Sequence, residues 1–128
     1  MYSKTTENII ISVTPRYEDL PSDPSRLHFV FSYNIIIENG GNQIVQLKRR
    51  FWKIKSADGL IREVEGEGVV GEQPILHPGD QFQYSSWAPI TCEIGEMSGY
   101  FLMKNMETKE LFKVLVPKFQ FVADPLLN

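Results

Sequence analysis

The chain is 128 residues long, which suits one domain spanning residues 1–128. Its 42% hydrophobic and 23% charged residues exclude a disordered chain, and the net charge of −3 gives no attraction to nucleic acid or to an anionic membrane. Cys92 is the single cysteine, residues 1–8 are too polar for a signal peptide, and no apolar run approaches the roughly 18 residues of a membrane span. We therefore expect a cytoplasmic protein without an internal disulfide.

Two strands are predicted near the start of the chain, where apolar and polar residues alternate. Residues 8–14 bring three apolar side chains to one face, and residues 27–37 carry an apolar residue at every odd position, beginning with Leu27. The inward residues expected in the first strand are Ile9, Ile11 and Val13. Because side chains alternate between the two faces of a strand, both segments fit half-buried strands. The proline-containing segment 18–25 is predicted to be a loop.

A third strand, residues 44–55, changes phase along its length. Two of its apolar residues are at odd positions and two are at even ones: Val45, Leu47, Trp52 and Ile54. A β-bulge within residues 48–50 would shift the register by one and return both pairs to the same face. Asp58-Gly59 then predicts a hairpin turn, and residues 60–65 form the returning strand.

The rest of the chain is predicted to form short strands separated by turns. Pro78-Gly79 is typical of a type II turn, and residues 82–87 form a strand. The strand that begins near Gly95 would place three side chains inward: Met97, Phe101 and Met103. Residues 111–122 close the sheet, and no helical pattern occurs. The sequence thus predicts an all-β sandwich of the immunoglobulin or fibronectin type III kind, with seven to eight antiparallel strands.

The spacing G-x-G-x-x-G occurs in residues 66–71 and is typical of a dinucleotide-binding loop. In such a fold the glycines follow a strand and begin a helix, whose N-terminus binds the pyrophosphate. Here Pro74, Pro78 and Gly79 follow closely, and a helix does not form across so many helix-breaking residues. The dinucleotide-binding fold is therefore excluded.

Two interpretations of the glycine loop stay open. In the first, the loop connects the sheets, and its glycines allow positive φ and close backbone packing. In the second, backbone N–H groups surround a phosphate without a helix, as in an anion nest. The residues predicted for that phosphate site are Gly66, Gly68, Gly71, Arg62 and Arg50. Lys48 and Arg49 could add positive charge, whereas Glu67 and Glu72 would repel an anion.

The chain resembles the ApaG family of small bacterial proteins, which also occurs as a domain in some eukaryotic F-box proteins. The residues that carry the resemblance cover nearly the whole chain: VTP at 13–15, HFVFSYNIIIEN at 28–39, VQLKRRFWKI at 45–54, EVEGEGVVGEQP at 63–74, LHPGDQFQYSS at 76–86, GEMSGYF at 95–101 and LFKVLVPKF at 111–119. The resemblance implies a fibronectin type III-like sandwich and no established enzymatic activity. It also implies an adaptor role in F-box proteins and a link to cobalt and magnesium tolerance in bacteria.

No catalytic residues, metal site or cofactor are predicted. His28 and His77 lack the i,i+2 or i,i+4 spacing of metal ligands, and with Cys92 they do not form a transition-metal set. Cys92 also has no neighbouring histidine in the sequence to act as its base. Four acidic residues could form a loose magnesium site: Glu63, Glu65, Glu67 and Glu72. We favour the alternative, in which they form a solvated strand face.

The aromatic residues are more numerous than strict alternation places inside the sandwich. Those in question are Phe51, Trp52, Tyr84 and Trp87, which belong either to the core or to an exposed binding surface. We predict a non-catalytic binding or adaptor module for an unidentified protein partner, present as a monomer or a homodimer. The alternative is a module that binds phosphate, pyrophosphate or a nucleotide through the loop from Gly66 to Gly71.

Overall fold

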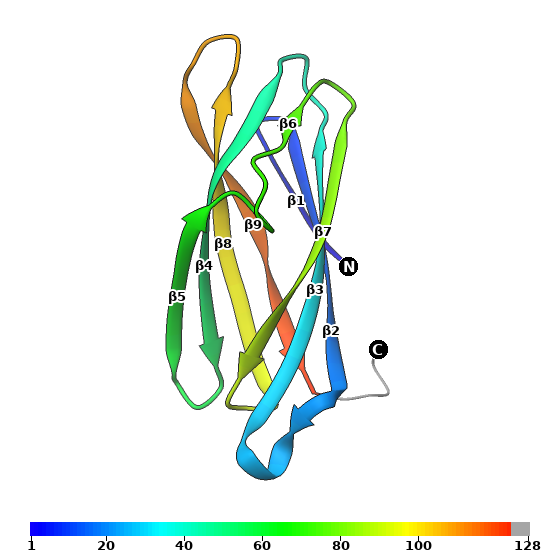
Figure 1. The fold of residues 1–128 in the computed structure, drawn as a ribbon, viewed down its shortest axis with the longest axis vertical. Coiled ribbons are helices and arrows are strands. Elements are labelled where there is room, and N and C mark those ends of the chain that lie inside the picture. Colours follow the sequence, from blue (N-terminus) through cyan, green and yellow to red (C-terminus); the bar gives the residue numbers. More distant parts are fainter. Residues whose placement is uncertain (124–128) are drawn as a thin grey trace.

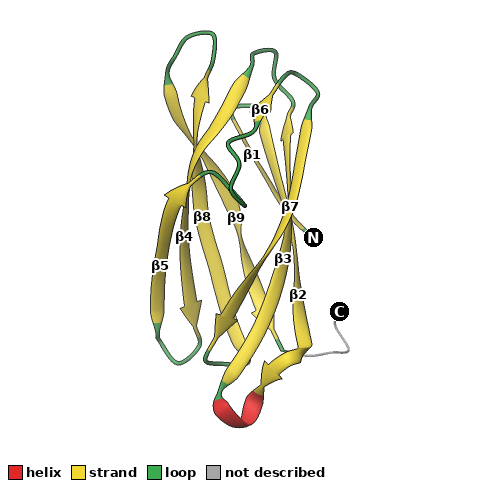
Figure 2. Ribbon diagram, in the orientation of Figure 1, coloured by secondary structure: helices red, strands yellow, loops and turns green. Residues whose placement is uncertain are grey.

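The computed structural model describes residues 1–123, in which two antiparallel sheets pack face to face (Figure 1). The four-stranded sheet has the order β1 (Tyr2–Thr6), β2 (Ile9–Asp23), β3 (His28–Asn39), β7 (Gln81–Ile90). The five-stranded sheet has the order β5 (Ile61–Glu67), β4 (Val45–Ser56), β8 (Ile94–Asn105), β9 (Leu111–Val122), and β6 (Ile75–Leu76) pairs with β4. One 3₁₀ turn, Pro24–Arg26, is the helical element of the described residues (Figure 2). The predicted all-β sandwich is confirmed, although residues 1–123 form nine strands rather than seven to eight, because β1 and the short β6 were not expected.

The core lies between the sheets and follows the predicted alternation. The residues expected to face inward are at most 1% exposed: Ile9, Ile11, Val13, Met97, Phe101 and Met103. Phe119 lies at the centre of an aromatic cluster, with ring centroids within 6.3 Å of Tyr33, Trp52 and Phe121. Burying such rings stabilises the fold mainly through the hydrophobic effect, and their tilted and edge-on packing adds to it.

The predicted β-bulge in β4 is present. The register between β4 and β8 shifts between Leu47 and Arg49. Leu47 and Trp52 are therefore both buried, although one has an odd and the other an even position in the sequence. The shift also places Arg50 on the same face as Trp52, toward the space between the sheets, whereas Phe51 faces outward. Bulges commonly redirect a side chain in this way.

Three details of the sequence interpretation were wrong. Residues 2–6 form β1, which was not predicted; Glu7 and Asn8, with φ of 46° and 68°, connect it to β2 in a two-residue turn. The predicted loop at 18–25 is mostly strand, because β2 continues to Asp23 through a register irregularity. Leu27 is 64% exposed rather than inward, because it adopts φ of 54° and ends the 3₁₀ turn.

The two sides of the sandwich are closed differently. On one side β1 lies against β9, where Thr6 Oγ1 and Tyr2 OH accept hydrogen bonds from backbone N–H groups of β9. On the other side β5 and β7 are edge strands, and the segment between β5 and β6 runs between them (Figure 1). Arg62 on β5 spans this side by donating from Nη2 to the carbonyl oxygen of Pro89 on β7, at 3.2 Å. The glycine loop therefore covers the open side of the sandwich.

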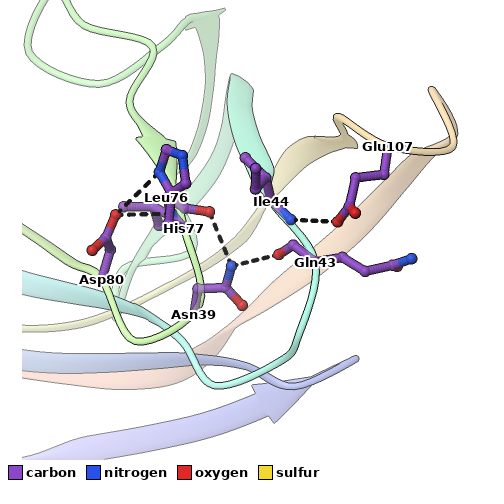
Figure 3. A network of polar contacts seen from close by, with 7 residues as sticks. All are labelled: Asn39, Gln43, Ile44, Leu76, His77, Asp80 and Glu107. Carbon is purple, nitrogen blue, oxygen red and sulfur yellow. Dashed lines mark hydrogen bonds and ion pairs between the residues drawn. The ribbon is translucent and has the colours of Figure 1, made fainter.

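A network around Asn39 connects the loops at one end of the sandwich (Figure 3). The Asn39 side chain is buried, and its Nδ2 donates to the carbonyl oxygens of Gln43, at 2.8 Å, and Leu76, at 3.0 Å. Its Oδ1 accepts from the Gly41 N–H at 3.0 Å. One buried amide thus holds together the loop after β3 and the end of β6.

Candidate functional site

The glycine loop is a tight turn attached to the end of β5. Val69 and Glu72 exchange two backbone hydrogen bonds of 2.9 Å, and the residues between them, Val70 and Gly71, have φ of 45° and 79°. Two consecutive positive φ angles within such a pair are typical of a type I′ hairpin turn. The side chain of Val69 is fully buried and anchors the turn in the core. The elements that follow are the strands β6 and β7, as expected once the dinucleotide-binding fold was excluded.

Each glycine of the motif has a local structural reason. Gly68 has φ of 61°, and a Cβ there would lie 2.1 Å from the carbonyl oxygen of Glu72. Gly71 supplies the second positive φ of the turn. Gly66 lies under the guanidinium group of Arg50, whose nitrogens would be 3.0 Å from an added Cβ. Turn geometry and the packing of Arg50 together account for the spacing.

Several backbone N–H groups of the loop already have acceptors within the protein. The Gly68 N–H donates to the carbonyl oxygen of Lys48, at 2.9 Å, and the N–H groups of Val69 and Glu72 donate to each other's carbonyl oxygens. The side chain of Gln73 also donates to the Lys48 carbonyl oxygen, at 3.0 Å. The donors that this region offers to a ligand are therefore mainly side chains.

The turn contains a strained residue, which gives a testable prediction. Val70 is β-branched and 56% exposed, yet it has positive φ, a conformation that costs such a residue about 1–2 kcal/mol. Val70→Asn creates Asn-Gly, the pair that type I′ turns prefer, and should raise the free energy of unfolding by about 1 kcal/mol in urea titrations. Val64→Asn, at an exposed position within β5, is the matched control and should lower it. Equal effects of the two substitutions would refute the assignment of strain to Val70.

The two arginines of the predicted phosphate site lie on the open side of the sandwich. Arg50 Nη1 donates to the carbonyl oxygens of Glu67, at 3.0 Å, and Gly68, at 2.9 Å, and so fastens the loop to β4. Arg62 makes the contact with β7 described above. Burial raises the pKa of Tyr33, and the charges of the two guanidinium groups counteract part of that rise. Of the two, Arg50 lines the pocket described next, whereas Arg62 is not among its lining residues.

A small pocket of about 200 Å³ lies beneath the loop, between the two sheets. We call it the inter-sheet pocket; Trp52, Val69, Val70 and Gly71 contribute to its lining, together with four polar side chains: Tyr33, Arg50, Tyr84 and Ser86. Sequence reasoning missed Tyr33 and Ser86 as site residues and left Tyr84 between core and surface. The sequence feature that these three residues share, and that could have identified them, is a hydroxyl group at an inward-facing position of β3 or β7.

The hydroxyl groups of the pocket stay protonated at neutral pH. Burial raises the pKa of Tyr84 far above its ordinary value, and the neighbouring Tyr33 raises it further, against the opposing effect of Arg50. Burial also raises the pKa of Tyr33, although a hydrogen bond with Ser86 and the two arginines counteract it. Among residues 1–123, the Tyr84 hydroxyl is the buried side-chain polar atom that has no hydrogen-bond partner. Such an atom is costly to bury, so it marks a place where a further group is expected.

A second candidate surface lies on the outer face of the five-stranded sheet. The rings of Phe51 and Tyr100 stack at a centroid distance of 4.5 Å, and they line a shallow groove of about 590 Å³ with Lys53, Glu63 and Glu65. We call this surface the aromatic groove. Arg49 lies over the ring of Phe51 at 6.0 Å, and Lys113 lies over the ring of Tyr100 at 4.6 Å. Of the other two aromatics left open above, Trp52 is core and Trp87 is 57% exposed on β7.

The acidic and metal-ligating residues of the described chain are dispersed. Residues 1–123 contain no group of three or more His, Cys, Asp or Glu side chains arranged to hold a metal ion. His77 pairs with Asp80 at 3.5 Å in an exposed turn, and Cys92 is a free, partly exposed cysteine. Nor does any helix in residues 1–123 have the length and apolar character needed to cross a membrane.

The profile of the ApaG domain matches residues 19–105 of this sequence. The chain belongs to the ApaG family. Among ApaG relatives, it is 42% identical over 119 residues to Protein ApaG of Brucella canis, an alignment covering 93% of this chain and 91% of the relative. It is 44% identical to Protein ApaG of Paramagnetospirillum magneticum, with the same coverage.

Solved structures agree with the ApaG assignment and with the fold. A crystal structure of a Bordetella pertussis protein described as ApaA superposes with a TM-score of 0.86 at 38% identity, over 89% of this chain and 92% of that one. A second solved structure superposes with a TM-score of 0.83 at 35% identity, over 90% of this chain and 86% of that one. The resemblance found in the sequence motifs is thereby confirmed.

Proposed function

We propose that this ApaG-family domain is a non-catalytic module that binds a protein partner through the aromatic groove. The observation that carries the proposal is the stacked pair of Phe51 and Tyr100, held on a solvent-facing sheet between two cations. Rigid aromatic side chains on a surface contribute large contact area at little cost in conformational entropy, and interfaces are enriched in them.

The surroundings of the pair fit a protein ligand with an apolar side chain at its centre. Leu115, which is 41% exposed, follows Tyr100 in the same cross-strand row and extends the apolar surface. Lys53, Glu63 and Glu65 supply charges of both signs beside the rings. Protein–protein interfaces usually have an apolar centre surrounded by a polar or charged rim.

The test compares partner capture by matched surface variants. The immobilised domain is incubated with lysate of the source cells, and bound proteins are quantified for wild type, Phe51→Ser/Tyr100→Ser and Trp87→Ser. Loss of the aromatic pair should reduce capture of the partner at least about tenfold, because such anchors dominate interface energy. Trp87→Ser removes an exposed aromatic from the other sheet and should leave capture unchanged. Equal capture by all three proteins, or no specific partner at all, would overturn the proposal.

We further propose that any effect of this domain on cobalt or magnesium tolerance is indirect and passes through its partner. The motivation is the family resemblance combined with a sequence that offers His28, His77 and Cys92 without ligand spacing. Calorimetry of the purified domain with cobalt should give no heat of tight binding. A saturable cobalt isotherm would contradict this part of the proposal.

A second candidate function is binding of phosphate, pyrophosphate or a nucleotide at the glycine loop. The observation that favours it is the position of Arg50, whose guanidinium group lies against Gly66 and donates to the carbonyl oxygens of Glu67 and Gly68. Guanidinium groups are well suited to bind phosphate oxygens. Nuclear magnetic resonance (NMR) titration with each of the three ligands tests it, with saturable shifts at the amides of residues 66–71 as the expected result.

A further inference from the structure

We infer that the inter-sheet pocket binds one small oxyanion of the size of inorganic phosphate, held by Arg50, Tyr84 and the hydroxyl pair Tyr33–Ser86. This inference rests on the second candidate function and narrows it to a ligand class and a position. The ligand would lie between the sheets, beneath the type I′ turn, rather than on the outside of the glycine loop.

The lining of the pocket has the chemistry of an oxyanion site. Arg50 is permanently cationic, and its Nη1 is already oriented by two loop carbonyl oxygens. A guanidinium group fixed in this way loses little further freedom when its other N–H groups bind a ligand. The protonated hydroxyl groups of Tyr33, Tyr84 and Ser86 add donors from the opposite sheet.

Tyr84 supplies the independent indication that a ligand belongs there. Tyr84 is buried, with an exposed fraction of 8%, and its hydroxyl group has no partner among residues 1–123. Tyr84, Tyr33 and Arg50 line the same pocket, and both neighbours also influence the pKa of Tyr84. A buried hydroxyl that nothing within the fold satisfies is retained more easily where a ligand accepts its hydrogen bond.

Charge and size restrict the ligand. Arg50 is the charged side chain among the lining residues, so the pocket favours an anion. Its volume of about 200 Å³ is below the roughly 300–1,000 Å³ of sites that enclose drug-sized ligands, which favours a small ligand. Val69 and Trp52 supply apolar walls, which strengthen charge-assisted hydrogen bonds by excluding water.

The test is a titration of isotope-labelled protein with inorganic phosphate, against sodium chloride at matched ionic strength. We compare wild type with Tyr84→Phe, which removes only the unpartnered hydroxyl group, and with Tyr100→Phe, which makes the same change in the aromatic groove. Wild type and Tyr100→Phe should show the same saturable shifts at the Arg50 side chain and at the amides of Val70 and Gly71.

Tyr84→Phe should bind phosphate about tenfold more weakly, as expected for one lost hydrogen bond to a charged ligand. Without phosphate, its midpoint of urea unfolding should not fall, because the removed hydroxyl group has no partner. Arg50→Gln is the second variant and should abolish the shifts.

The outcomes separate this inference from the second candidate function. Saturable shifts that are the same in wild type and Tyr84→Phe would place phosphate on the outside of the loop and overturn the inference alone. No saturable shift in wild type at millimolar phosphate would overturn the inference, and the second candidate function is overturned as well if pyrophosphate and nucleotides also give no shift. The protein-partner proposal is unaffected by either result, because its test uses Phe51 and Tyr100.

Discussion

Gly68→Ala is expected to lower the free energy of unfolding by about 3 kcal/mol. An added Cβ would lie 2.1 Å from the Glu72 carbonyl oxygen, so the turn must move before alanine fits. Crowding of this kind costs about 1–3 kcal/mol, and the positive φ of Gly68 adds about 1 kcal/mol for a residue with a Cβ. The effect is large because Val69, next in the chain, is buried and holds the turn in place.

A matched control separates the two contributions at Gly68. Gly59 also has positive φ, 92°, but nothing lies within 4 Å of an added Cβ. Gly59→Ala should therefore lose only about 1 kcal/mol, the cost of the backbone conformation alone. Urea unfolding followed by Trp52 fluorescence measures both variants. If they lose the same free energy, steric contact with Glu72 is not what requires glycine at position 68.

The second large effect is expected at Asn39. Asn39→Ala removes the two hydrogen bonds that Nδ2 donates to the carbonyl oxygens of Gln43 and Leu76 (Figure 3). It also removes the hydrogen bond that Oδ1 accepts from the N–H of Gly41, so all three groups lose their partner. Each such loss costs about 1 kcal/mol or more in a buried setting, so the free energy of unfolding should fall by about 3 kcal/mol.

Asn42→Ala is the matched control for Asn39, because Asn42 is exposed in the same loop. It should change the free energy of unfolding by less than about 0.5 kcal/mol. Hydrogen exchange should localise the damage in the Asn39→Ala variant to the loops around residues 40–44 and 76–80. A loss below about 1 kcal/mol would mean that water replaces the Asn39 amide without cost, and the network would then not be structural.

The sandwich could be predicted because apolar and polar residues alternate strictly along its strands. Where a strand departs from this alternation, the change is itself visible in the sequence. The change from odd to even apolar positions between Leu47 and Trp52 has few structural solutions, and a bulge is the simplest of them. By contrast, β1 has mostly polar side chains, and its stability comes from hydrogen bonds to β2 and β9 rather than from a hydrophobic face. Periodicity does not detect a strand of this kind.

The candidate sites were predictable only in part. Arg50, Arg62 and the glycines were predicted from residue types that suit a phosphate, and of these Arg50 and Gly71 line the inter-sheet pocket. The pocket itself was not predicted, because it depends on pairings between distant segments. Tyr33 lies opposite Ser86 in the β3–β7 register, and Arg50 turns toward them through the bulge. Nothing local in the sequence of β3 or β7 specifies that these side chains meet.

The bulge in β4 has a consequence for how this protein can change over generations. Arg50 and Phe51 are consecutive residues on opposite faces of one strand, and each belongs to a different candidate site. Loss of the bulge without a change in chain length would exchange the two faces beyond it, turning Arg50 toward solvent and Phe51 into the sandwich. Substitutions that abolish the bulge are therefore never confined to one site. Both surfaces require the bulge, whereas substitutions that keep it can still alter each of them separately.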